Sequence, residues 1–194
     1  MTERGAGGTI GTTEHFAIPG VGGLIRCFKN GEEWLLVQER DKAGAPSEAG
    51  LIEIPAGKIH AFESIYDCLR REIKEETGLD VTRIHGESES IKVNLNGYSV
   101  LSYAPYSSSQ NLLGEYPIMV QTFVCEAGGM QVERSDESRN IRWMRVSELG
   151  ILLRENPARF YPMHLATLHR YVTDCGTAGF FREAQSHANE SVLA

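Results

Sequence analysis

The chain has 194 residues, of which 41% are hydrophobic and 23% charged, and its formal net charge is −7. This length suits one domain with a buried core, and no apolar run is long enough to cross a membrane. An acidic chain without a lysine and arginine run argues against a partner that is nucleic acid. Four scattered cysteines without a C-x-x-C pair are typical of free thiols, and they fit an expected location in the reducing cytoplasm.

The first half of the chain predicts short strands followed by a helix. Residues 1–15 are polar and glycine-rich, and we interpret them as a flexible leader. In chain order we expect strands at residues 21–28 and 33–38, a loop at 41–50, a short strand at 51–54 and a helix from 62 to 77. The pair Asn30-Gly31 favours a hairpin turn between the first two strands. Gly78 stands where a glycine that ends a helix belongs.

The second half predicts more strands and two closing helices. In chain order we expect strands at residues 91–95, 98–103, 118–126 and 141–146, a long loop at 104–117, and helices at 147–154 and 157–171. Asn96-Gly97 indicates a second hairpin, and residues 176–194 are interpreted as a polar tail. Strands with a helix between them and helices at the end predict one mixed α+β domain over residues 16–175.

The most specific pattern lies in residues 57–79. It reads Gly57, five residues, Glu63, seven residues, Arg71-Glu72, Ile73, one residue, Glu75-Glu76, one residue, Gly78 and Leu79. With average residue frequencies, so many specified positions match by chance with odds of roughly 10⁻⁸ to 10⁻⁷ in a chain of this length.

The helical part of this pattern places carboxylates on an inward face. Successive helix residues rotate by about 100°, so Glu72 and Glu76 fall within the stripe of Ile65, Leu69 and Ile73, with Glu75 at its edge. Ionised carboxylates on such a face repel one another and lose hydration unless a cation neutralises them. Magnesium binds carboxylate oxygens together with phosphate oxygens. The pattern therefore predicts a site for a divalent cation.

Residues 57–79 resemble the Nudix box without a departure, and the chain is similar to Nudix hydrolases. The resemblance implies an α/β/α sandwich with a mixed sheet and C-terminal helices. It also implies Mg²⁺ or Mn²⁺ as cofactor and attack by water on a phosphoanhydride, without a covalent nucleophile. The implied metal ligands are the Ala56 carbonyl and the carboxylates of Glu72, Glu75 and Glu76.

Further roles follow from the box and its surroundings. The expected catalytic residues are Arg71, Glu75, Glu76 and Glu137, and the expected structural residues of the motif are Gly57, Glu63 and Gly78. Gly57 is expected to allow a tight turn beside the helix, and Arg71 is expected to pair with Glu63 or a neighbouring glutamate. Glu137 resembles a late-loop acid that serves as base in some relatives, or it is a solvated loop glutamate.

The substrate stays open between alternatives. The lead-in over residues 53–58 resembles the branch that hydrolyses ADP-ribose and nucleotide sugars, whereas the absence of proline between Gly78 and Pro105 favours a house-cleaning nucleoside triphosphate pyrophosphohydrolase. A non-catalytic nucleotide-sensing domain is the third alternative. Candidate substrate-binding residues are Arg40, Glu53, Tyr103 and Tyr106, and Arg40 is interpreted either as a phosphate contact or as an exposed ion pair. The expected partners are a small nucleotide and, from the resemblance, a second copy in a homodimer.

Overall fold

The computed structural model describes residues 14–114 and 116–190, with side chains described as far as residue 176. Its centre is an eight-stranded sheet. The strands are β1 (Ile18–Lys29), β2 (Glu32–Arg40), β3 (Ile52–Glu53), β4 (Ala56–Lys58), β5 (Asp80–Ile84), β8 (Ser107–Gln110), β9 (Ile118–Gly128) and β10 (Ser138–Arg145). The order is β10-β2-β1-β9-β5, with β3, β4 and β8 pairing with β2, β1 and β9. The sheet is mixed because β1 and β9 are parallel, whereas the other pairs are antiparallel.

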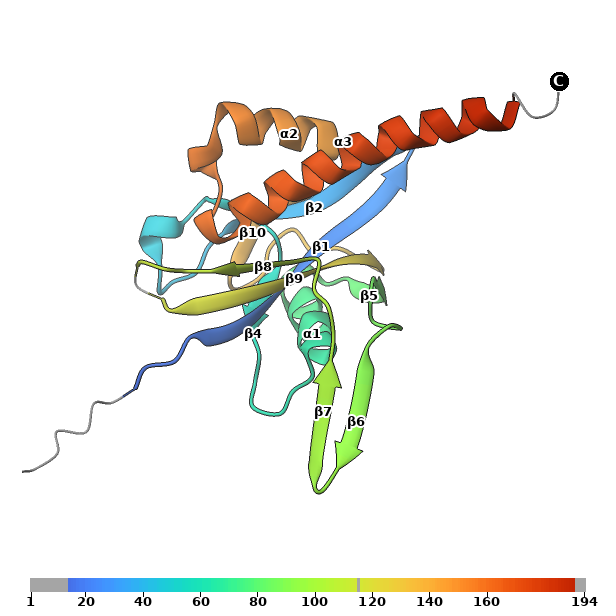
Figure 1. Cartoon of the computed structure of the whole chain (residues 1–194). Helices are drawn as coiled ribbons and strands as arrows, with labels where there is room; N and C mark the ends of the chain where they lie inside the picture. Colours follow the sequence, from blue (N-terminus) through green and yellow to red (C-terminus); the bar gives the residue numbers. More distant parts are fainter. Residues whose placement is uncertain (1–13, 115, 191–194) are drawn as a thin grey trace, which may run out of the picture.

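Helices cover both faces of this sheet (Figure 1). The helix α1 (Ile65–Thr77) lies on one face, and α2 (Val146–Glu155) and α3 (Pro162–Glu190) lie on the other. Successive strand residues point to opposite faces, so in β1 Ile25 joins the core under α1 and Leu24 joins the core under α2 and α3. The expected α/β/α sandwich with C-terminal helices is therefore confirmed.

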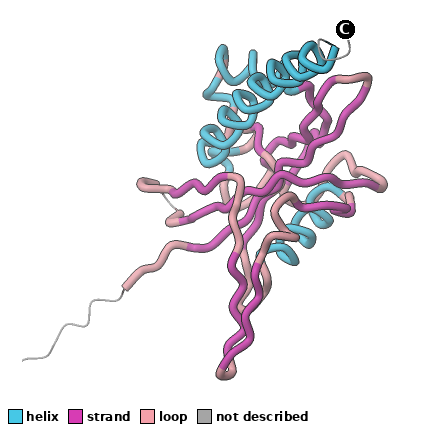
Figure 2. The backbone as a smooth tube through the Cα atoms, turned by 45° about the vertical axis from the view of Figure 1, so that its right-hand side comes forward, coloured by secondary structure: helices cyan, strands magenta, loops and turns pink. Residues whose placement is uncertain are grey.

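Both predicted hairpins are present. Asn30 and Gly31 turn between β1 and β2 with φ of 53° and 78°, and Asn96 and Gly97 repeat this with φ of 49° and 81°. The second turn joins β6 (Ile91–Leu95) to β7 (Tyr98–Ser102), which form a separate two-stranded sheet. This hairpin projects away from the layered part of the protein (Figures 1 and 2).

The helix of the motif begins three residues later than expected, at Ile65. The Ser64 hydroxyl accepts a hydrogen bond from the Asp67 backbone N–H at 3.1 Å and caps the helix. Phe62 lies in the left-handed region with φ of 64°, which excludes it from the helix. The far end is as predicted, because Gly78 has φ of 75° and its N–H donates to the Lys74 carbonyl.

Other boundaries differ more. The segment 104–117, expected as a plain loop, contains the edge strand β8, whose polar sequence Ser-Ser-Ser-Gln lacks the apolar alternation that predicts strands. A short 3-10 helix (Pro157–Arg159) precedes α3, and α3 continues to Glu190 through much of the expected tail. The expected leader lies outside the described residues, apart from residues 14 and 15. No helix of the described part is long and apolar enough to span a membrane.

Candidate active site

A cleft of about 550 Å³ lies beside the helix of the motif, where β2, β4 and α3 meet. Its lining combines cationic, acidic and aromatic side chains, among them Arg40, Lys42, Lys58, Glu72, Glu137, Tyr116 and Tyr161. A site of this kind fits a ligand that carries both negative charge and a flat ring.

Glu76 contacts Ala56, one of the residues that line this cleft, and is only 3% exposed. Its Oε2 accepts hydrogen bonds from Gln38 Nε2 at 2.6 Å and from the Ala56 backbone N–H at 3.2 Å. Its Oε1 is buried without a hydrogen-bond partner, and Lys42 Nζ lies 3.9 Å away. Burial, reinforced by the charge of Glu53, raises the pKa of Glu76 to about 8. This buried carboxyl group therefore has one cation at the edge of ion-pair distance, Lys42, and a second carboxylate, Glu53, close by.

Glu53 forms a second buried carboxylate beside it. Arg40 Nη1 donates to Glu53 Oε2 at 2.6 Å, and Gln38 bridges the two acids by donating also to Glu53 Oε1 at 3.4 Å. Arg40 further donates to Glu48 and stacks at 3.9 Å on the Tyr161 ring. Because Arg40 is only 9% exposed, its interpretation as an exposed ion pair is wrong, and the ion pair is buried.

Arg71 organises the outer carboxylates, as expected from the motif. Its guanidinium donates twice to Glu63, at 2.8 and 2.9 Å, once to Glu72 at 2.7 Å and once to Glu75 at 3.3 Å. The hydrogen bonds from Arg71 lower the pKa of Glu63 to about 2. Glu75 remains largely exposed at the edge of the helix. One arginine thus holds three of the four glutamates that the motif of residues 57–79 specifies.

Gly57 is required for a reason different from the expected tight turn. It lies in the extended strand β4, paired with β1. A Cβ at this position would lie 1.8 Å from the carboxyl carbon of Glu72 and 2.1 Å from both of its oxygens. Gly57 therefore leaves the space that the Glu72 carboxylate occupies against the strand.

The donor set fits a hard divalent cation. Within residues 14–114 and 116–190, no three histidine, cysteine, aspartate or glutamate side chains are already gathered as ligands, because Glu72 and Glu75 turn towards Arg71. Nevertheless the unpartnered Oε1 of Glu76 is buried beside further carboxylates on the same helix, and oxygen donors of this type are those that magnesium takes. A cation here would supply the missing counter-charge.

Two residues that sequence reasoning missed complete the site. Gln38 is fully buried and joins Glu53 to Glu76. Lys42 forms an ion pair with Glu137 and faces Glu76. The sequence offered one signal for each residue. Gln38 is a glutamine at the end of an apolar strand, and Lys42 is a second cation two residues after Arg40. Glu137 itself lines the cleft with a half-exposed side chain.

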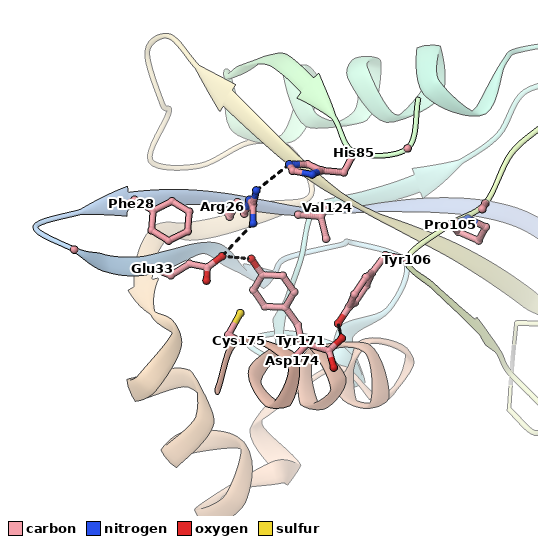
Figure 3. Close-up of a pocket in the computed structure, with 13 residues that line it drawn as sticks. Arg26, Phe28, Glu33, His85, Pro105, Tyr106, Val124, Tyr171, Asp174 and Cys175 are labelled. Atoms are coloured by element: carbon pink, nitrogen blue, oxygen red, sulfur yellow. Dashed lines mark hydrogen bonds and ion pairs between the residues drawn. The ribbon is translucent and has the colours of Figure 1, made fainter. Parts of the chain in front are cut away.

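Tyr103 and Tyr106 are not among the residues that line this cleft. Tyr103 packs against the rings of Tyr66 and Phe123, at 6.2 and 6.0 Å, beside the core under α1. Tyr106 lines a separate cavity of about 750 Å³ on the α3 side of the sheet, where its hydroxyl donates to Asp174 at 2.7 Å (Figure 3). The expectation that these two rings cover the acidic site is therefore wrong, because β8 leads the segment away along β9.

The rings beside the acidic cleft belong to Tyr116 and Tyr161. Lys58 Nζ lies 5.6 Å from the centre of the Tyr116 ring, and Arg40 covers Tyr161. Tyr116 comes from the end of the segment that contains Tyr106, whereas Tyr161 directly precedes α3. Tyr116 and Tyr161, rather than the candidates Tyr103 and Tyr106, are therefore the tyrosines beside the acidic cleft.

Known proteins resemble this chain in sequence and in fold. A family model described as the NUDIX domain matches residues 18–165. Nudix hydrolase 8 of Arabidopsis thaliana is 46% identical over 61 residues, which span 31% of this chain and only 15% of that relative. A MutT protein from Methanosarcina mazei Go1 has a TM-score of 0.54 at 20% identity, covering 84% of this chain and 98% of that chain. The NUDIX domain of Shewanella oneidensis NrtR, complexed with ADP ribose, has a TM-score of 0.57 at 12% identity, covering 83% and 89%.

Proposed function

The chain belongs to the Nudix family, and from this premise we propose that it hydrolyses a phosphoanhydride bond in a nucleoside diphosphate linked to another group. The observation that carries the proposal is the buried Glu76 carboxyl, whose Oε1 has no hydrogen-bond partner and which contacts Ala56 and Lys42, two residues that line a cleft with cationic and aromatic side chains. A buried carboxyl without a partner is costly unless a ligand or cation uses it.

We assign the divalent cation, Mg²⁺ or Mn²⁺, to the carboxylates of Glu72, Glu75 and Glu76 and the carbonyl of Ala56. When bound, it polarises the diphosphate and stabilises negative charge on the phosphoryl oxygens. The backbone of Ala56 already touches Glu76 through its N–H, which supports its membership of this ligand set. Arg71 is a positioning residue, since its hydrogen bonds hold Glu72 and Glu75 on one side of α1.

Lys42 is the residue that we assign to the substrate phosphates. It reaches into the cleft between Glu76 and Glu137 and is bound at present only to carboxylates. An ammonium group binds phosphate oxygens as a point charge. Glu137, freed from Lys42 by the substrate, and the exposed Glu75 are the carboxylates placed to accept the proton of the attacking water.

Tyr116 and Tyr161 offer ring faces for the base or the sugar, because each lines the cleft that contains Glu72. The bound ADP ribose named for the Shewanella NUDIX domain supports a ligand of this class. The resemblance of residues 53–58 to the branch that hydrolyses ADP-ribose and nucleotide sugars supports the same choice.

A panel of nucleotides tests the proposal. ADP-ribose, nucleotide sugars and nucleoside triphosphates are incubated with the purified chain and Mg²⁺ or Mn²⁺, and the products are separated by anion exchange. We expect a nucleoside monophosphate and a phosphorylated second product from the diphosphate derivatives, and no cleavage in excess chelator. Release of pyrophosphate from triphosphates alone would transfer the proposal to that class. Tight nucleotide binding without any cleavage would instead identify a sensing domain and overturn hydrolysis.

A further inference from the structure

The projecting hairpin β6–β7 carries a continuous apolar face. Val93 pairs with Val100 and Leu95 pairs with Tyr98 in the antiparallel register, so these four side chains share one face, and Ile91 extends it at the next position but one. All five are exposed: Ile91 63%, Val93 50%, Leu95 66%, Tyr98 76% and Val100 55%. We name this set the hairpin face.

The other side of the hairpin has a different character. Lys92, Asn94 and Ser99 alternate with the residues of the hairpin face and point away from it. Leu101, also on that side, packs with Tyr103 against the core under α1 and anchors the base of the hairpin. The hairpin is therefore tied to the domain at its base, while its apolar face meets water along its length.

This exposure is costly for an isolated protein. A two-stranded hairpin alone is marginally stable in water, and β6 and β7 pair with each other but with no strand of the eight-stranded sheet among the described residues. With large side chains of roughly 150–250 Å² each, the exposed fractions amount to roughly 500–600 Å², the upper end of the apolar patches that monomers leave uncovered. A partner that covers the face would remove this cost.

We propose that the hairpin face is a homodimer interface, in which the hairpins of two copies pack face to face about a two-fold axis. An interface between identical copies uses the same patch twice, and two such faces together bury roughly 1,000–1,200 Å², which reaches the lower limit of about 1,000 Å² for a specific interface. The hairpin face contains no charged residue, so two copies of this acidic chain can meet there without placing like charges opposite one another.

The inference is independent of hydrolysis, since none of its residues lines the cleft that contains Glu72.

Sedimentation of the full chain tests the interface. The wild type should have twice the mass of the 21.5 kDa chain across micromolar concentrations. Val93→Lys places a charge at the centre of the hairpin face and should give the single-chain mass with an unchanged circular dichroism spectrum. The matched control Asn94→Lys adds the same charge one residue along, on the other side, and should remain a dimer.

Cross-linking tests the same interface if the Val93→Lys variant does not fold. Val93→Cys should form a disulfide-linked dimer under mild oxidation, and Asn94→Cys should not. A wild type of single-chain mass overturns the proposal, as does a folded Val93→Lys that remains a dimer or a dimer lost equally in Asn94→Lys. A monomeric wild type that binds phosphatidylcholine vesicles, with binding lost in Val93→Lys, would assign the face to a membrane and likewise overturn it.

Discussion

Replacing Gly57 with alanine tests whether the position of the Glu72 carboxylate controls turnover. The new Cβ would lie 1.8 Å from the Glu72 carboxyl carbon, whereas carbon atoms in contact rest at about 3.5–4.0 Å. The carboxylate must therefore move away by roughly 2 Å, because β4 is held by its pairing with β1. A displacement of about 1 Å in a catalytic arrangement can cost about 100-fold. We expect kcat to fall by a factor on the order of 100 or more.

The assay is steady-state kinetics with the best nucleotide of the panel at saturating Mg²⁺, beside thermal unfolding of both proteins. Gly128→Ala is the matched control, since its Cβ would meet nothing closer than 4.0 Å, and its kcat should equal that of the wild type. A Gly57→Ala protein that folds and keeps kcat within a factor of about three would refute the reasoning that this carboxylate must stay in place.

Four further variants test the assignments of the other residues. Tyr116→Ala should raise KM and change the ranking of substrates, whereas Tyr106→Phe should leave both unchanged in the same assay, because Tyr106 lies in the other cavity; equal effects would contradict the placement. Lys42→Gln should raise KM by about 10- to 100-fold, the value of one charged hydrogen bond, and unchanged KM would remove it from the phosphate site. Burial lowers the pKa of His164 to about 3. Below pH about 6.5 the unfolded chain therefore binds a proton that the folded chain does not, and the free energy of unfolding falls by on the order of 1 kcal/mol for each pH unit of acidification. His164→Asn keeps an acceptor for the Ile54 N–H but cannot take up this proton. Urea unfolding should therefore show a smaller fall in unfolding free energy on acidification for the variant than for the wild type. An identical pH dependence in both proteins would contradict the assignment to His164.

The helix of the box could be predicted from local information alone. The 3.6-residue period places Glu76 inward, and the structure buries it together with Ile65, Leu69 and Ile73. Gly78 and the two Asn-Gly turns need only their own backbone conformations, and each is found where it was predicted. These features depend only on residues that are close in the sequence, so they can be predicted without knowing the fold.

The surroundings of the box depend on pairing between distant strands. Gln38 meets Glu76 only because β3 pairs with β2 and β4 pairs with β1 in the same sheet, and Lys42 reaches the same place from the loop after β2. Tyr106 is turned to the α3 side by the pairing of β8 with β9. The residue pattern within one segment does not show how distant strands pair. For this reason the sequence did not indicate that Tyr103 and Tyr106 lie away from the acidic cleft, or that Lys42 lies in it.

Manganese binding to Glu76→Gln most directly tests the claim that the buried carboxyl group forms the cation site of a hydrolase. Bound Mn²⁺ is measured by electron paramagnetic resonance in the wild type, in Glu76→Gln and in the exposed control Glu89→Gln, and kcat is measured on the same samples. We predict that Glu76→Gln weakens Mn²⁺ binding at least about tenfold and lowers kcat by a factor on the order of hundreds, while Glu89→Gln matches the wild type. Wild-type Mn²⁺ affinity and turnover in a folded Glu76→Gln protein would contradict the account.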